Sequence, residues 1–164
     1  MAIPGLSTLG IEVGYAVVTS TSSLPAKFTV LPRCNSADGI EMTTNSIDAS
    51  ALEDYVTQHV AGRADIPETW GLTFNNTSES RTAVEAMITA YETSLGNDSD
   101  TLVCIEIYDP KDTSGAYFVF VQPPTILGMS EVSQNSLKTF TLTSVLVKVW
   151  GYDNGVAPDD GGSN

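Results

Sequence analysis

The stretch Ser78–Leu95, SESRTAVEAMITAYETSL, is the one long segment of the sequence whose pattern predicts an α-helix. Its apolar residues recur at three- and four-residue spacing, which places them on one face of a helix. They are Ala83, Val84, Met87, Ile88, Tyr91 and Leu95, of which Val84, Met87, Ile88 and Tyr91 are expected to pack against the rest of the fold. Ser78 is the expected N-cap, because its hydroxyl can accept from first-turn amides. Gly96-Asn97 is expected to end the helix in a left-handed conformation.

The rest of the sequence is patterned as strands and turns. Thr69–Asn75 alternates strictly and should point Trp70, Leu72 and Phe74 inward. Ala116–Gln122 is apolar on both faces, so we expect it to be buried on both sides. Further strands are predicted at 11–18, 27–31, 102–108, 125–133 and 137–150, with 32–39 as a loop. The pattern predicts about seven or eight strands, hence a mainly β (α+β) fold, a β-sandwich or β-barrel with one flanking helix at 78–95.

A long connection at about 40–66 separates the early strands from Thr69–Asn75, and its weakly patterned first part, 40–49, has two possible short strands. Within it, Ser50 and Glu53 fit a capping box, and Leu52, Tyr55 and Val56 fall at helical spacing, so the segment is either a short helix or an extended loop. Long connections with apolar residues are usually functional. We therefore favour a compact loop of the Ω type that packs on a partner.

Length and composition indicate one globular domain. The 164 residues are 41% hydrophobic and 16% charged, which is enough apolar content to build a core. We expect a flexible N-terminal arm at 1–10, a single β domain at 11–152 and a disordered acidic tail at 153–164.

The charge balance limits the kinds of partner. Twenty acidic residues against seven basic ones give a formal net charge of -13. Such a surface disfavours both nucleic-acid binding, which needs Lys and Arg to neutralise phosphates, and binding to an anionic membrane. The N-terminus lacks the basic and apolar regions of a signal peptide, and no apolar run is long enough to span a membrane. We expect the protein to stay in the cytoplasm that makes it or to leave by lysis.

The sequence offers little chemistry. The single histidine, His59, has no second His or Cys nearby to complete a zinc site, and a Cys34–His59 nucleophile pair has no supporting motif. Cys104 lies in an apolar run and is expected to be a buried free thiol. The acidic pairs fall mostly in turns, where Asp is favoured for backbone reasons. We therefore predict no enzyme activity, no metal and no cofactor.

One stretch resembles a known family. Asn45-Ser46-Ile47-Asp48 leads into Ala51-Leu52-Glu53-Asp54-Tyr55-Val56, followed by Gly62-Arg63-Ala64-Asp65 and the strand Thr69–Asn75. The order and spacing of these elements are similar to those in the major tail tube proteins of long-tailed bacteriophages with non-contractile tails. With the downstream Gly-x-Tyr-Phe-x-Phe strand and the long last strand, the resemblance covers roughly residues 10 to 152.

The resemblance implies a structural protein of the virion tail. Family members form hexameric rings that stack into a hollow tube for DNA ejection, with sheets joined edge to edge around the lumen. It implies assembly in the bacterial host cytoplasm and contacts with tape measure, tail terminator and tail-tip proteins, while DNA passes without specific binding. The inter-subunit or inter-ring contacts would come from the long loop, through Ile47, Asp48, Leu52, Glu53, Tyr55 and Val56. The candidates for the lumen face are Thr139, Thr141 and Thr143.

Two alternatives remain from the sequence. The fold is also similar to the tube protein of type VI secretion systems. From a different class, the chain could be a monomeric or small-oligomer β-sandwich that binds a ligand such as a sugar. An exposed cleft lined by aromatic residues would favour this ligand-binding module, and assembly into rings or tubes would favour the tail protein.

Overall fold

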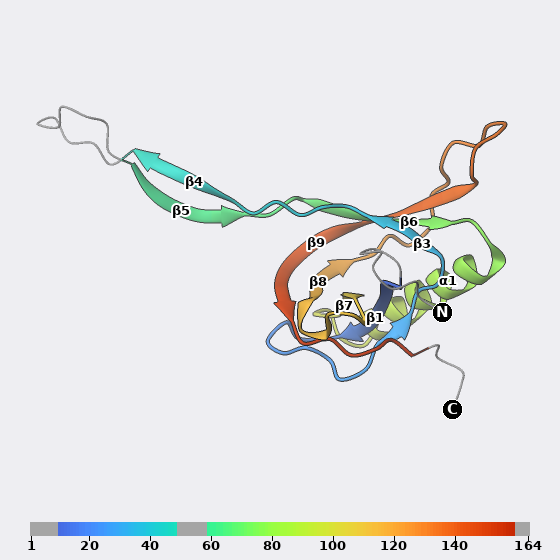
Figure 1. Ribbon diagram of the computed structural model, residues 1–164. Coiled ribbons are helices and arrows are strands. Elements are labelled where there is room, and N and C mark those ends of the chain that lie inside the picture. The colour runs from blue at the N-terminus through green and yellow to red at the C-terminus, as the bar shows by residue number, and fades with distance from the viewer. Residues whose placement is uncertain (1–9, 49–58, 160–164) are drawn as a thin grey trace, which may run out of the picture.

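A strongly curved antiparallel sheet with one helix beside it forms the body of the protein (Figure 1). The computed structural model describes residues 10–48 and 59–159, and in 43–48 and 59–64 it describes the backbone alone. The seven strands follow the order β2-β1-β7-β8-β9-β6-β3. The elements are β1 (Glu12–Val18), β2 (Thr29–Val30), β3 (Cys34–Ala37), β4 (Thr43–Asp48), β5 (His59–Asp65), β6 (Thr69–Asn75), α1 (Ser78–Leu95), β7 (Leu102–Tyr108), η1 (Thr113–Gly115), β8 (Ala116–Gln122) and β9 (Thr139–Asp153).

The helix has the predicted bounds, but both of its ends differ from the prediction. The N-cap is Thr77 rather than Ser78, because Thr77 keeps an extended backbone and its hydroxyl accepts from the Ser80 amide at 3.2 Å. Ser80 completes the capping box by accepting from the Thr77 amide at 3.1 Å, so two amides at the helix start are satisfied. Gly96 is right-handed at φ -64. Tight turns after the helix, in which Asn97 and Asp98 both donate to the Ser94 carbonyl, remove the need for a left-handed residue.

The main core lies between the curved sheet and α1. Val84, Met87, Ile88 and Tyr91 are all buried in it, as part of the predicted helix face. Trp70, Leu72 and Phe74 of β6 point inward as predicted, with at most 3% exposure. Helix and strand therefore bury their apolar faces against each other, which is the dominant stabilising contribution in a fold of this size.

A second apolar cluster covers the other face of β7 and β8. It joins the buried residues Phe28, Leu102, Cys104, Tyr108, Ala116, Phe118 and Phe120. Because Val119 and Val121 point into the main core, β8 is buried on both faces, as its sequence predicts. Cys104 is the buried free thiol that its apolar run indicates.

Two predictions about strands are wrong. Residues 34–37, expected within a loop, form β3, which pairs with β6 at the edge of the sheet; Arg33 reaches this edge through a left-handed turn at φ 64. Residues 125–133, expected as a strand, form none, and Ile126 and Met129 are 81% and 75% exposed. Apolar content alone cannot make a strand without a neighbour that completes its hydrogen bonds.

The described ends of the long connection at 40–66 are strands, one of them within the 40–49 stretch where short strands were possible. The two strands form the antiparallel hairpin β4–β5, paired from Thr43↔Asp65 to Asp48↔His59 with a register shift between Thr44 and Ser46. Figure 1 shows this hairpin projecting far from the body, in line with β3 and β6. Residues 49–58 lie outside the described residues, so the choice between helix and loop at 50–58 is untested.

The C-terminal segment is more ordered than predicted. β9 continues to Asp153, and residues 154–159 make backbone hydrogen bonds to Phe28, Val30 and Thr113. The expected disorder is therefore wrong for 153–159, because these bonds and the packing beneath them hold a segment whose own sequence carries no strand pattern. Residues 1–9 and 160–164 lie outside the described residues.

Candidate assembly surfaces

The outer face of β6 and β9 is a nearly uncharged strip. The two strands pair from Thr69↔Val145 to Asn75↔Thr139. On this face Thr141 and Thr143 are exposed, Thr139 is half-buried, and the Thr73 and Thr141 hydroxyl oxygens lie 3.3 Å apart. The three predicted lumen residues thus share one solvent-facing row.

The same row continues with exposed apolar side chains and almost no charge. Val145 and Val147 are 51% and 41% exposed. Neither β6 nor the 139–147 half of β9 contains a Lys or Arg. The Asp38 carboxylate lies beside the row and accepts a hydrogen bond from the Gly71 amide at 3.0 Å, and the exposed Lys138 and Lys148 come directly before and after the strip in the sequence. Between these two lysines the strip offers hydroxyls and methyl groups, and no cation to a phosphate backbone.

The predicted partner-binding residues of the long connection are placed only in part. Ile47 and Asp48 lie at the outer end of β4, opposite Val60 and His59. Leu52, Glu53, Tyr55 and Val56 fall outside the described residues. Figure 1 shows the described outer end of the β4–β5 hairpin far from the body of the protein.

A second projection was missed by the sequence reasoning. The segment 123–138 leaves the sheet between β8 and β9 at the end away from the hairpin (Figure 1). It carries four exposed apolar side chains, Ile126, Met129, Val132 and Leu137, each at least 58% exposed. Pro123-Pro124 and Gly128 were the signals that could have identified it as irregular. The protein thus presents a group of exposed apolar side chains just before β9 begins.

A groove at the base of the hairpin has the aromatic lining that a sugar site would need. It holds about 520 Å³ and is lined by residues that include Ile40, Met42, Trp70, Tyr117 and Tyr152. The Trp70 ring is only 3% exposed, and its indole N–H already donates to the Asp38 carbonyl at 2.7 Å. Tyr117 and Tyr152 pack edge to face, with ring centroids 4.8 Å apart. Trp70 is therefore not open to a ligand, and Tyr152, which is 76% exposed, is the aromatic side chain of the groove that remains accessible.

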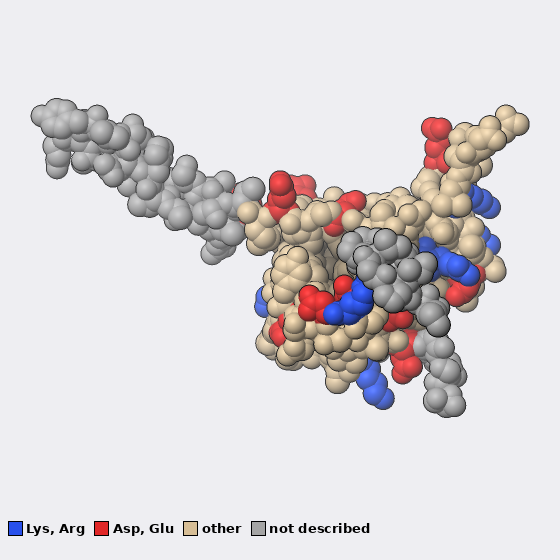
Figure 2. Space-filling view, in the orientation of Figure 1, with Lys and Arg blue, Asp and Glu red and all other residues tan. Residues whose placement is uncertain are grey.

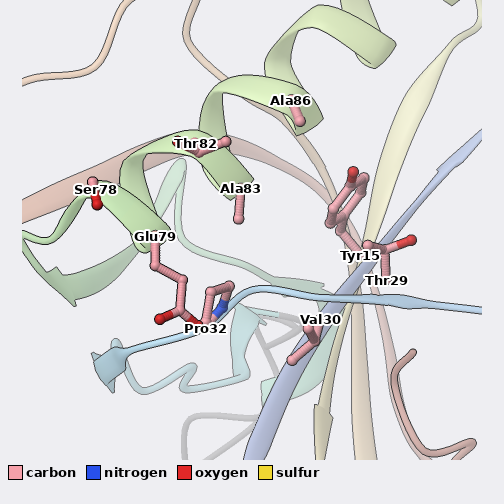
Figure 3. A pocket seen from close by; sticks show the side chains of 9 residues that line it. All are labelled: Tyr15, Thr29, Val30, Pro32, Ser78, Glu79, Thr82, Ala83 and Ala86. Carbon is pink, nitrogen blue, oxygen red and sulfur yellow. The ribbon is translucent and has the colours of Figure 1, made fainter. Parts of the chain in front are cut away.

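Another groove, of about 640 Å³, lies between α1 and the strands β1 and β2 (Figure 3). Tyr15, Thr29 and Val30 line its sheet side, and Ala83 and Ala86 its helix side. Its one charged lining residue is Glu79, whose carboxylate lies 3.8 Å from the Arg33 side chain with both groups 61% exposed. Such an exposed ion pair contributes little, and the lining holds no nucleophile with an adjacent base.

Neither cysteine is prepared for catalysis. Burial raises the pKa of Cys34 to about 11; burial and the nearby Glu106 carboxylate raise the pKa of Cys104 to about 12. Both are therefore neutral thiols at physiological pH, whereas a nucleophile needs the thiolate. Within 10–48 and 59–159, no group of His, Cys, Asp and Glu could hold a metal ion. The His59 side chain itself is not described.

One buried acid stands out. Glu106 of β7 is fully buried; its Oε2 accepts from the Val156 amide at 2.8 Å, and its Oε1 has no hydrogen-bond partner. Burial raises the pKa of Glu106 to about 7, although the Val156 amide opposes the shift. Its sequence context, Ile105-Glu106-Ile107 in an apolar strand, was a signal that the sequence reasoning did not use.

On the face shown in Figure 2, the acidic groups lie in several separate places, with basic groups scattered among them, and they do not gather into one site. In the described part of the chain no helix has the length and hydropathy needed to cross a membrane.

Comparison by sequence finds no matching family model and no matching curated protein. Comparison by structure finds the same fold in a chain from the tail of an empty gene transfer agent particle with C6 symmetry. The TM-score is 0.52 at 9% identity, over 89% of this chain and 96% of that one. A chain from the virion of a native gene transfer agent particle aligns with a TM-score of 0.50 at 10% identity, over 87% and 94% of the two chains. The predicted fold class, mainly β with one flanking helix, is confirmed.

Proposed function

We propose that this chain is a structural subunit of a phage-like tail, which assembles into stacked hexameric rings that form a tube. The observation that carries the proposal is the shared fold over nearly the full length of a chain from a tail with C6 symmetry. The resemblance in the 45–77 region supports the same assignment from the sequence. The role is structural, without a catalytic site or cofactor.

The projecting hairpin supports assembly. A two-stranded hairpin extending alone into solvent is only marginally stable, so its length suggests that another subunit covers it. We assign inter-subunit or inter-ring contact to Ile47 and Asp48 and to the segment beyond them, with Leu52, Tyr55 and Val56 as apolar anchors and Glu53 among them.

The uncharged strip supports a lumen role for β9. A channel for DNA must not bind phosphates, and Thr139, Thr141 and Thr143 offer no cation. The net charge of -13 adds general repulsion of DNA. We therefore assign these threonines to the lumen, with DNA passing during ejection into the host without specific binding.

The proposal implies further partners. A tube needs a tape measure protein inside it, a terminator at one end and tail-tip proteins at the other. Assembly would take place in the bacterial host cytoplasm, and the final location would be the virion tail. A non-contractile, siphophage-type tail is the form we propose from the sequence resemblance; a tube like that of type VI secretion is the alternative within the class.

The ligand-binding module has weaker support. Its best site is the groove beside Trp70, where the indole is buried and Tyr152 is the one strongly exposed aromatic side chain. Binding of oligosaccharides to that groove by a strictly monomeric protein would favour the module over the tail subunit.

The hairpin assignment can be tested by adding charge at its end. Replacing Leu52 and Tyr55 together with Asp should abolish assembly and leave the melting temperature of the monomer unchanged. The matched control replaces Thr57 and Gln58 with Asp, which adds the same two charges nearby without removing apolar side chains. If both double variants formed normal tubes in electron micrographs, the hairpin would not be the contact.

A further inference from the structure

The last described residues run as a strap across the sheet. We use the word strap for residues 154–159, which cross the outer face of β8, β7 and β1 and end beside β2. The Gly155 amide donates to the Thr113 carbonyl at 2.7 Å, and the Asp159 amide donates to the Phe28 carbonyl at 2.8 Å. The Val30 amide donates to the Asp159 carbonyl at 2.6 Å, forming a parallel bridge with β2. The strap therefore occupies the open edge of the sheet at β2.

Two glycines let the strap approach this closely. A Cβ on Gly155 would lie 2.5 Å from the Ala116 Cβ and 2.7 Å from the Tyr108 ring. A Cβ on Gly14 would lie 3.0 Å from Pro158. One glycine belongs to the strap and the other to the strand beneath, so the contact is built from both sides.

The strap is nevertheless held by few groups. All six of its residues are half-buried or exposed, and its bridge to β2 is isolated rather than part of a continuous ladder. By contrast, Phe28, Tyr108 and Ala116, which lie around its path, are at most 8% exposed. Opening the strap would therefore uncover apolar surface and an unpaired edge while leaving the main core intact.

Glu106 is the one charged group beneath the strap. Its single hydrogen bond comes from Val156, and its other oxygen has no partner, so closure of the strap buries an under-satisfied carboxyl group. The titratable groups near it are Glu12 of β1, and Cys104 and Tyr108 of β7. Tyr117 of β8 packs against the main core on the other face of the sheet, and strap residues 154–158 contain no titratable side chain. Among the described residues no cation is found to act on Glu106, so a rise in pH that ionises it works against closure.

We propose that the β2 edge is an acceptor site for an extended strand from a second copy of this chain, and that the strap occupies this site in the free subunit. The inference rests on the proposed function. The strap itself shows that the site accepts an extended backbone, and sheet extension by such a strand is a common mode of recognition. Lys27 and Arg33 flank β2 in the sequence, and Arg33 lies 3.8 Å from Glu79 of its own chain. Lys27 therefore favours an acidic strand at this edge, which a second copy of this acidic chain can supply despite the general repulsion between copies.

The groove between α1 and β2 supplies the side-chain half of the acceptor site. Thr29 and Val30 line that groove as well as the edge that the strap covers (Figure 3). Side chains of an added strand alternate between its two faces. The side chains on one face of the added strand would enter the groove beside Ala83 and Ala86, and those on the other face would take the place of the strap.

Truncation tests the competition between strap and partner. The variant ends at Asp153, and its matched control ends at Asp159, so the control loses only the residues beyond the strap. If the strap closes the site about nine times in ten, removing it should lower the critical concentration for assembly roughly tenfold. A higher critical concentration for a truncated chain that still melts like the control would overturn the proposal.

Hydrogen exchange on the monomer tests the strap independently of assembly. The Gly155, Val156 and Asp159 amides should exchange far faster than those of β7 and β8. Their opening equilibrium should shift toward the open strap as pH rises from about 5 to 7, and Glu106→Gln should remove that dependence. Fast exchange of the strap amides in a protein that never assembled would contradict the proposed tube and support an opening strap. Strap amides that are as protected as those of β7 and β8 would contradict the opening of the strap, whatever the chain assembles into.

Discussion

Strands β8 and β9 are neighbours in one sheet, yet they meet opposite environments. β8 is covered on both faces, with Phe118, Val119, Phe120 and Val121 at most 1% exposed. The first half of β9 buries Phe140 and Leu142 on one face and exposes Thr141, Thr143 and Val145 on the other. An antiparallel sheet commonly leaves one polar face to solvent, and the threonines of β9 fit that pattern. The exposed Val145 and Val147 are the residues of this face that folding of the single chain does not explain, whereas β8 is explained by stability alone.

The largest expected effect lies on the buried side of this comparison. Phe118→Ala removes a ring that is 1% exposed and packs against Phe28 with centroids 5.8 Å apart. We expect a loss of about 3–5 kcal/mol in the free energy of unfolding, measured by urea titration, because a cavity remains where the ring was. Thr143→Ala on the exposed face is the control. Equal losses from both variants would show that the contrast between the two strands is false.

Next in size is the effect of pH, which acts through Glu106 in the covered layer. Its pKa is raised from 4.5 to about 7 in the folded chain, so folding favours the protonated form. This contribution to stability is fully present below pH 4.5 and is lost as pH rises to about 7, by at most about 3 kcal/mol. Urea titrations at several pH values should show this decline, and Glu106→Gln should flatten it. A free energy of unfolding that rises between pH 4.5 and 7 because of Glu106 would contradict the claim that burial favours its protonated form.

A smaller effect is expected where the chain leaves β6 for the helix. Thr77→Ala removes the hydroxyl that accepts from the Ser80 amide. We expect a loss of about 1 kcal/mol, visible as a lower melting temperature. Ser78→Ala, which removes the hydroxyl that the sequence alone favoured as the cap, should change the melting temperature much less. The reverse ranking would restore Ser78 as the cap.

The smallest effect on stability, and the most informative about function, is expected on the exposed face of β9. Thr141→Lys and Thr143→Lys should each change the free energy of unfolding by no more than about 0.5 kcal/mol, because both side chains face solvent. If this face lines a lumen, the double Lys variant should still form tubes but retain DNA in a salt-dependent way, measured by binding of short duplexes. Tubes of the Lys variant that bind no more DNA than wild type would remove these threonines from the lumen.

The sequence predicted the parts of the fold that repeat a periodic pattern. The helix bounds, the inward residues of β6 and the double burial of β8 all follow from apolar spacing. The pattern failed where hydrogen bonds to distant strands decide the outcome. β3 forms because β6 has an edge that is open for pairing. The strap is ordered because the Asp159 amide donates to the Phe28 carbonyl and the Val30 amide donates to the Asp159 carbonyl.

The candidate surfaces were harder to predict for the same reason. The threonines of β9 were identified correctly as one row, since alternation alone defines that face. Part of the apolar projection at 123–138 was predicted as a strand, because Ile126 and Met129 are residue types typical of a core. In the structure no described strand pairs with this segment, and both side chains are exposed to solvent. Glu106 gave a signal as a lone acid in an apolar strand, but its meaning depends on the strap that covers it.

Electron microscopy of the purified full-length chain, over a series of protein and salt concentrations, tests the central claim most directly. High salt screens repulsion between subunits that each carry a net charge of -13, so assembly should increase with both variables. The account predicts rings or hollow tubes with six-fold symmetry. A chain that stayed monomeric up to its solubility limit at every salt concentration, both at full length and when truncated after Asp153, would contradict it.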